Sequence, residues 1–152
     1  MGLSLQFLIG PPKEMLDALS QCNYAELDRL TERKADLSLH LQPRDLQMLS
    51  DCAASHTSQP LKPFRTALTC YFDETDRGYF LVHDDWVDAM ATIDIKEYKA
   101  IATEWFQKMA ENYPNEQIGE PSAAAEGSVH GLIELCKYAV QFEKPVIHIW
   151  SA

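Results

Sequence analysis

The amino-acid sequence predicts an α+β fold, a single domain over residues 1–152 in which helices pack against a mixed sheet of about three to five strands. Three observations lead to this prediction. Strand-like patterns stand at both ends of the chain, a hairpin pattern stands in its middle, and helical patterns lie between them. A chain of 152 residues has the usual length of one domain with one core, in which amphipathic helices bury their apolar faces against a sheet.

Three elements are expected in the first part of the chain. Apolar side chains alternate with polar ones in residues 3–9, which indicates a strand with one buried face. Apolar residues at helical spacing predict two short helices, over residues 12–21 and 24–34. Asn23 precedes the second helix, where its side chain can cap a free backbone N–H group.

The next segment combines a strand pattern, a helix and a loop. Leucines at positions 37, 39 and 41 alternate with polar residues, which predicts an edge strand, with a helix as the competing interpretation. A helix is expected from Pro43 until shortly before Ser55. Residues 55–63 contain two prolines and several turn-forming residues, so a long loop is predicted there.

The middle of the chain predicts a hairpin that leads into a helix. Residues 67–72 and 79–82 are rich in β-branched and aromatic side chains, and the polar residues 73–78 between them end in a glycine. A helix is expected to begin near Asp84, because Asp84 or Asp85 can accept hydrogen bonds from the first N–H groups of that helix.

Two longer helices and a strand are expected in the last third. Residues 94–112 show apolar side chains at spacings of three and four, and Asp94 is available as their N-cap. A second helix is predicted over residues 122–142. Residues 145–150 are apolar on both alternating sets, which predicts a central closing strand beside the first strand of the chain.

Negative charge is concentrated around the predicted hairpin. The chain has 13 basic and 23 acidic residues, a formal net charge of −10. Residues 73–97 hold eight acids and two bases, so they carry −6 of this total. Such a charge disfavours nucleic acids and anionic membranes as partners, because both are bound mainly by Lys and Arg. It favours encounter with a basic protein, although a simple solvated surface is the alternative interpretation.

The spacing of the cysteines and the composition of the first residues indicate the cellular compartment. Cys22, Cys52, Cys70 and Cys136 lie far apart without a C-x-x-C pair, which predicts reduced thiols in a cytoplasmic protein. The first twelve residues lack the basic region of a signal peptide, and no apolar run is long enough to span a membrane. We therefore expect a cytoplasmic location.

No metal or cofactor is predicted. Residues 73–84 resemble a calcium-binding loop, but Arg77 stands at the fifth position, where an oxygen ligand is needed. None of the five histidines has a second histidine or cysteine at the spacing typical of zinc sites.

The sequence contains no complete catalytic motif. Residues 127–131, Gly-Ser-Val-His-Gly, differ from the nucleophile elbow, whose serine is central and follows a strand. Gly127 and Gly131 are interpreted as allowing close helix packing. We therefore predict no catalytic residues.

Part of the second half resembles a known family. Tyr79-Phe80-Leu81 lead into an acidic helix start and Trp86, one helix ends at Tyr113-Pro114, and the last helix carries Tyr138-Ala139 before the closing strand. In these features, residues 79–151 resemble the YfbM-like family of small bacterial proteins of unknown function. The resemblance implies an α+β fold and supplies no reaction or site residues.

Two functions follow as hypotheses. The first is a non-enzymatic interaction module, of which an immunity protein would be one example, with an acidic face that binds a basic protein partner. Its predicted binding residues are Asp73, Asp76, Tyr79, Asp84, Asp85 and Asp88. The alternative is a small hydrolase or ligand-binding enzyme that uses Cys70 or His83 in a pocket lined by aromatic side chains.

Overall fold

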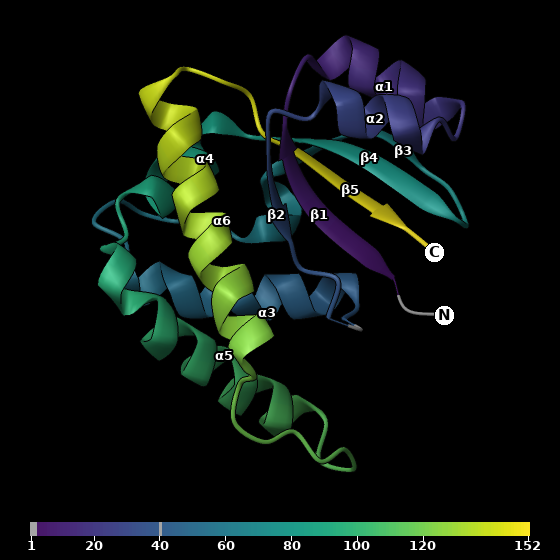
Figure 1. Cartoon of the computed structure of the whole chain (residues 1–152). Helices are drawn as coiled ribbons and strands as arrows, with labels where there is room; N and C mark the ends of the chain where they lie inside the picture. Colours follow the sequence, from purple (N-terminus) through teal and green to yellow (C-terminus); the bar gives the residue numbers. More distant parts are fainter. Residues whose placement is uncertain (1–2, 40) are drawn as a thin grey trace.

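The computed structural model describes residues 3–39 and 41–152, and its sheet has five strands in the order β2-β1-β5-β4-β3 (Figure 1). All four neighbouring strand pairs are antiparallel. The predicted α+β class is confirmed, but the predicted mixed sheet is wrong, because sequence patterns locate strands without giving their direction. The strands are β1 (Ser4–Ile9), β2 (Arg33–Asp36), β3 (Leu68–Asp73), β4 (Arg77–Val82) and β5 (Ile147–Ser151).

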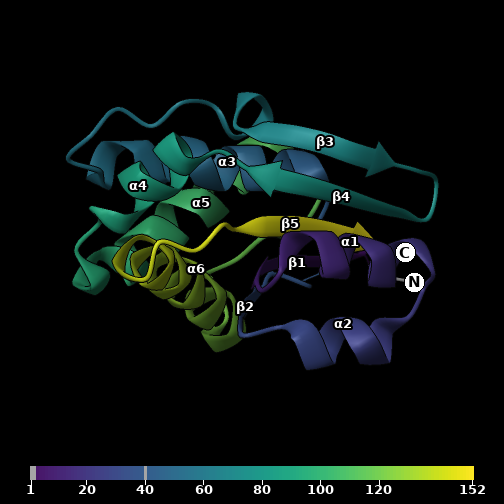
Figure 2. The ribbon, with the colours of Figure 1, turned by 90° about the horizontal axis from the view of Figure 1, so that it is seen from above.

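Helices cover both faces of this sheet (Figures 1 and 2). Helices α1 (Pro12–Ser20) and α2 (Tyr24–Leu30) pack on one face, and the later helices pack on the other. Each layer buries its own apolar cluster, so the strands contribute alternate side chains to two cores. The helices of the second face are α3 (Pro43–Ala53), α4 (Asp84–Ala91), α5 (Tyr98–Asn112) and α6 (Ala123–Gln141).

Several local predictions are confirmed. The first and last strands are neighbours, with Ser4 opposite Ser151, and β5 lies in the centre of the sheet. The side chain of Asn23 caps α2 by accepting a hydrogen bond from Glu26 N at 3.2 Å. Asp94 caps a short 3-10 helix (Ile95–Glu97) that leads into α5.

The predicted edge strand over residues 37–41, of which residue 40 lies outside the described residues, is misplaced, because β2 lies just before it. The ladder with β1 ends near Leu37, whose N–H donates to Leu5 O at 2.8 Å. At the next residue the Asp36 carboxylate accepts the Ser38 N–H, which turns the chain away. Helix α2 is correspondingly shorter than predicted, since the chain must reach β2 by Arg33.

The two cores differ in size. The α1–α2 side holds a small cluster that includes Met15, Leu19, Tyr79 and Ile149. The other side holds the main core, in which Trp86 and Trp105 are almost completely buried. Among the described residues, no helix has both the length and the apolar character needed to cross a membrane.

Candidate functional site

The acidic residues that we predicted as one docking face form two separate clusters. Asp73 and Asp76 lie at the β3–β4 turn, whereas Asp84, Asp85 and Asp88 lie at the start of α4. Strand β4 separates them, and its six residues span about 20 Å. Figure 2 shows the hairpin turn and α4 at opposite ends of this strand. The prediction of a single acidic face is therefore wrong in its geometry.

Some of these carboxylates are already bound within the protein. Arg77 pairs with Asp76 at 2.9 Å and with Glu74 at 3.4 Å, and Lys62 Nζ lies 3.2 Å from Asp85 Oδ2. Such exposed ion pairs add little stability, but they reduce the charge available to a partner.

Tyr79 cannot take part in a docking surface, which corrects the prediction for this residue. Its side chain is buried beneath α1, with 1% of the residue exposed, and its hydroxyl donates to Pro12 O at 2.7 Å. Burial, together with the neighbouring Tyr71, raises the pKa of the phenol. The aromatic residue that is exposed beside it is Tyr71, at 51%.

The structure does not join Cys70 and His83 as a nucleophile and its base. His83 Nδ1 lies 2.7 Å from Lys62 Nζ, and Nε2 lies 2.9 Å from Thr69 Oγ1. An ammonium group can only donate, so Nδ1 accepts and Nε2 carries the proton. Cys70 is an exposed thiol on β3. Neither Cys70 nor His83 lines the pocket described next.

Of the described pockets, the most extensive has a volume of about 600 Å³ and lies on the α3 side of the sheet. Helix α3 and the short 3-10 turn Phe64–Thr66 form one wall, and strands β3, β4 and β5 form the other. This volume is typical of small-molecule sites. The lining residues are Pro43, Arg44, Gln47, Phe64, Arg65, Leu68, Asp73, Glu74, Phe80, His148 and Trp150.

A buried histidine forms the floor of this pocket. His148 is 3% exposed, and its ring lies 4.7 Å from the ring of Phe7, 5.5 Å from that of Phe64 and 5.9 Å from that of Phe80, measured between centroids. Burial lowers its pKa to about 4, although a hydrogen bond with Gln6 O raises it. His148 is therefore neutral at pH 7. A lone histidine in an apolar closing strand was the one sequence signal for this site.

Two arginines stand at the pocket mouth. Arg44 donates to the Tyr113 hydroxyl, and its guanidinium lies 4.4 Å from the Tyr113 ring centroid. Gln47, about one helical turn further along α3, accepts a hydrogen bond from the Arg65 backbone N–H at 2.9 Å, which ties the turn that carries Arg65 to α3. Neither guanidinium forms a direct ion pair with a carboxylate of the described residues, although the Tyr113 hydroxyl that Arg44 binds donates in turn to Asp45 Oδ1.

The carboxylates on the opposite wall are engaged. Asp73 accepts a hydrogen bond from Trp150 Nε1 at 2.9 Å, and Glu74 pairs with Arg77. Their negative charge therefore opposes an anionic ligand less than their number suggests. The open groups of the pocket are cationic at the mouth and aromatic inside.

Gly78 makes room for the aromatic wall. It lies opposite Trp150 across the β4–β5 pair, and a Cβ atom at this position would come within 2.1 Å of Trp150 Nε1. The indole therefore lies directly on the backbone of β4, where only glycine leaves enough space.

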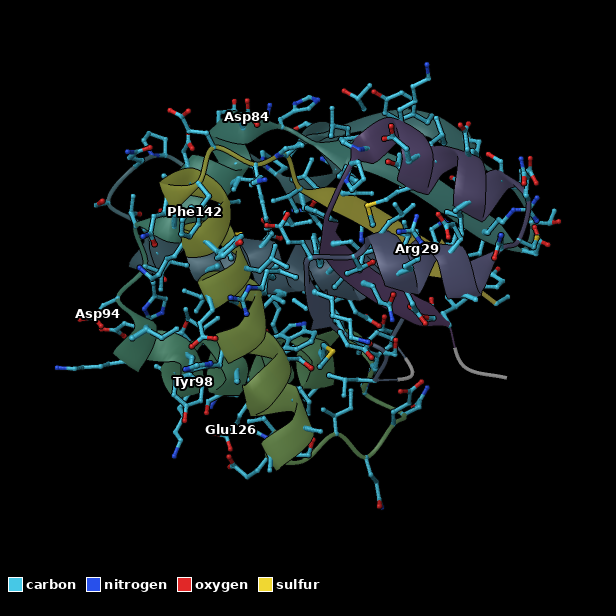
Figure 3. The ribbon with its side chains drawn as sticks, turned by 45° about the horizontal axis from the view of Figure 1, so that its top comes forward. Arg29, Asp84, Asp94, Tyr98, Glu126 and Phe142 are labelled. Carbon is cyan, nitrogen blue, oxygen red and sulfur yellow. The ribbon has the colours of Figure 1, made fainter. Side chains whose placement is uncertain are left out.

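A second groove, of about 440 Å³, lies between the start of α4 and the end of α6. The carboxylates of Asp84, Asp88 and Glu143 line it together with apolar side chains and with Lys144, whose ammonium group pairs with Glu32 at 3.6 Å. Nearby, Val140 and Phe142 are 43% and 50% exposed. In Figure 3, Phe142 and Asp84 lie toward the same end of the molecule.

The serine of the Gly-Ser-Val-His-Gly segment and the buried cysteine of α6 both have structural roles. Ser128 Oγ donates to Asp36 O at 2.7 Å, which ties α6 to β2. Burial raises the pKa of Cys136 to about 12, so its thiol is not ionised at neutral pH. Gly127 faces open space, so the interpretation that it permits close packing is wrong, and a Cβ atom added at Gly131 would lie 4.0 Å from the Ala35 Cβ, an ordinary contact. Over residues 3–39 and 41–152, no three His, Cys, Asp or Glu side chains converge on a possible metal position.

No protein-family model matches this chain, and no curated protein or solved structure matches it significantly. The resemblance to the YfbM-like family stays a prediction. The function must therefore be argued from the pocket and its residues.

Proposed function

We propose that this protein binds a small anionic molecule with a flat apolar part in the pocket between α3 and the sheet. One observation carries the proposal. Arg44 and Arg65 stand without carboxylate partners over an aromatic pocket, in a chain whose net charge is −10. Acidic groups are abundant in this protein, so two guanidiniums at one pocket that form no ion pair with them indicate that an anion from outside is their partner.

The two parts of the pocket would recognise two parts of the ligand. Guanidinium groups bind carboxylates and phosphates through paired, charge-assisted hydrogen bonds, each worth about 1.5–3 kcal/mol. The aromatic side chains of Phe64, Phe80 and Trp150 offer apolar surface to a flat ring. The ligand would thus lie with its anion at the mouth and its ring inside.

Binding, rather than catalysis, is the activity we propose, and we place it in the cytoplasm. Cys22, Cys52, Cys70 and Cys136 are free thiols, which fits a reducing compartment. At the pocket, His148 is the one described titratable group that is neutral, and no described hydroxyl or thiol lies among the lining residues as a nucleophile.

The test compares an anion with its neutral isostere. Benzoate and benzamide have nearly the same shape, and binding of either can be followed by quenching of tryptophan fluorescence. Trp86 and Trp105 are buried in the main core, so quenching by a small molecule reports mainly on Trp150. We expect benzoate to bind more tightly than benzamide.

Three variants make this comparison specific. Arg44→Gln and Arg65→Gln should each reduce the preference for benzoate. Arg29→Gln is the matched control, since Arg29 lies on α2, on the other face of the sheet, and pairs with Glu26 (Figure 3). The proposal is wrong if benzoate shows no advantage over benzamide in the wild-type protein, or if the control variant loses it equally.

The acidic groove at α4 and α6 supports a second candidate function, the docking of a basic protein segment. Asp84 and Asp88 have no hydrogen-bond or ion-pair partner within the described residues, and exposed Val140 and Phe142 lie close to the groove. Carboxylates beside exposed apolar side chains suit a segment in which basic and apolar residues alternate. Asp73 and Asp76, at the far end of β4, would not belong to this surface.

A short labelled peptide of alternating Lys and Leu can test this candidate by fluorescence anisotropy. The double variant Asp84→Asn/Asp88→Asn should weaken binding. The double variant Asp17→Asn/Asp28→Asn changes the net charge equally but lies on α1 and α2. If both double variants weaken binding to the same extent, the attraction is only that of an acidic protein for a basic peptide.

A further inference from the structure

We infer that the ligand of the α3 pocket carries a hydrogen-bond donor on its ring, at the end opposite its anion, and that His148 Nε2 accepts this bond. The ligand class is thereby narrowed to hydroxy- or amino-substituted aromatic acids. This inference rests on the proposed binding of an anion at Arg44 and Arg65. It assigns His148 as the residue that determines specificity within the pocket.

The surroundings of His148 fix which nitrogen carries the proton. Nδ1 lies 3.0 Å from the backbone oxygen of Gln6, and a carbonyl oxygen can only accept. Nδ1 is therefore protonated. In a neutral imidazole the other nitrogen is then an acceptor, so Nε2 presents a lone pair.

This acceptor has no partner among the residues that the structure describes. Its ring is surrounded by Phe7, Phe64 and Phe80, none of which offers a conventional hydrogen-bond donor. His148 is also one of the residues that line the pocket. A polar atom on a pocket wall without a partner in the protein is open to a hydrogen bond from a ligand or from water.

The difference in burial between the two arginines and His148 sets the orientation of the ligand. Arg44 and Arg65 are exposed, whereas His148 is 3% exposed, so the cations lie at the mouth and the acceptor lies at the floor. A ligand held at both ends must have its anion and its donor on opposite sides of the ring. A para-substituted aromatic acid has this arrangement.

A site that hydrogen-bonds a hydroxyl group discriminates against analogues that lack it, because its own buried group is then left unpaired. We therefore expect 4-hydroxybenzoate to bind at least about tenfold more tightly than 4-fluorobenzoate, since fluorine has a similar size but donates no hydrogen bond. Isothermal titration calorimetry of both compounds measures this ratio.

Substitution of His148 tests the assignment directly. In His148→Phe the ratio should fall to about one, because phenylalanine keeps the aromatic surface and removes the acceptor. Arg65→Gln should weaken both compounds and leave the ratio unchanged. This pair of results distinguishes the floor of the pocket from its mouth.

A second measurement covers the case in which His148→Phe does not fold, since this variant removes the hydrogen bond between the His148 ring and Gln6 O. The wild-type protein is labelled with ¹⁵N-histidine, and the Nε2 resonance of His148 is followed by NMR. It should move on addition of 4-hydroxybenzoate and move much less with 4-fluorobenzoate.

The outcomes separate this inference from the proposed function. If both compounds bind equally, need the arginines and leave the Nε2 resonance in place, the inference about His148 is wrong and the anion site stands. If neither compound binds in a way that depends on Arg44 and Arg65, the proposed function itself is wrong.

Discussion

Alternate residues of the central strands point to the two faces of the sheet, and the two sets of side chains lie in different environments. Tyr79, Ile147 and Ile149 point to the face that α1 and α2 cover, and they lie in a closed core. Phe80 and His148 point to the opposite face, where they line a pocket together with Trp150. The chain thus uses a single strand pair for stability on one side and for recognition on the other.

The difference arises from helix coverage. On the pocket side, the main core reaches the strands at Val82 and Val146, where α4 and α6 lie above them. Toward Trp150 the described helices leave the sheet partly uncovered, and α3 forms only one wall. On this face of the sheet, the main core therefore ends and the pocket begins where the helices no longer cover the strands.

The largest expected loss of stability comes from a cavity in the core under α1 and α2. Ile149→Ala removes a side chain that is 4% exposed, so a loss of about 2–5 kcal/mol in the free energy of unfolding is expected. Phe80→Ala, on the half-open face, should cost less because part of its surface already meets solvent. Urea unfolding of both variants measures the difference, and equal losses would contradict the distinction between the faces.

Gly78→Ala should disturb the pocket wall selectively. The added methyl group overlaps with the Trp150 indole, which must move, and overpacking of this kind costs about 1–3 kcal/mol. Loss of benzoate binding together with a shift in tryptophan emission is expected. Gly119→Ala is the control, since no atom lies within 4 Å of a Cβ at that position.

The dependence of stability on pH should reveal the buried histidine. In the unfolded chain His148 has the ordinary pKa of about 6.5, and burial lowers its pKa to about 4 in the folded protein. The unfolded state therefore binds more protons between these values. The contribution of His148 to stability is complete above pH 6.5 and is lost as the pH falls toward 4.

This pH dependence can be isolated with a variant. Between pH 6.5 and 4, unfolding in urea should show a steeper loss of stability for the wild-type protein than for His148→Gln. No charged group adds to the shift of this histidine, so added salt should change it little. Parallel curves for the two proteins would contradict the assignment.

The smallest expected change in stability comes from a position that lies on neither face of the sheet. Gly127 is within α6 and faces open space, so Gly127→Ala should stabilise the protein by about 0.5–1 kcal/mol through helix propensity. A thermal melt measures this gain. Benzoate binding should be unchanged, which makes this variant a baseline for the pocket variants.

The sequence predicted the local elements well because their signals are local. Alternation located β1, β-branched and aromatic residues around a polar turn located the hairpin, and capping residues such as Asn23 and Asp94 marked helix starts that the structure confirms. Apolar residues on both sides of the closing strand correctly predicted a central position. Such patterns depend on neighbours within a few residues, which the sequence displays directly.

The candidate site was mostly missed, since its residues meet only in the folded chain. Of the lining residues, Asp73 alone was among the predicted site residues, and it is held by Trp150, 77 positions away. The bond between His148 and Gln6 joins residues 142 positions apart. Charge counts predicted an acidic face without showing that β4 would divide it.

By itself, therefore, the sequence determined which segments become strands and helices, and that the chain folds as an α+β domain. Only the tertiary structure decided the antiparallel order of the strands, the burial of Tyr79, and the meeting of two unpaired arginines with a neutral histidine. The physical reason is that periodicity fixes which side chains share a face, whereas the helices packed on that face decide whether it becomes a core or a pocket.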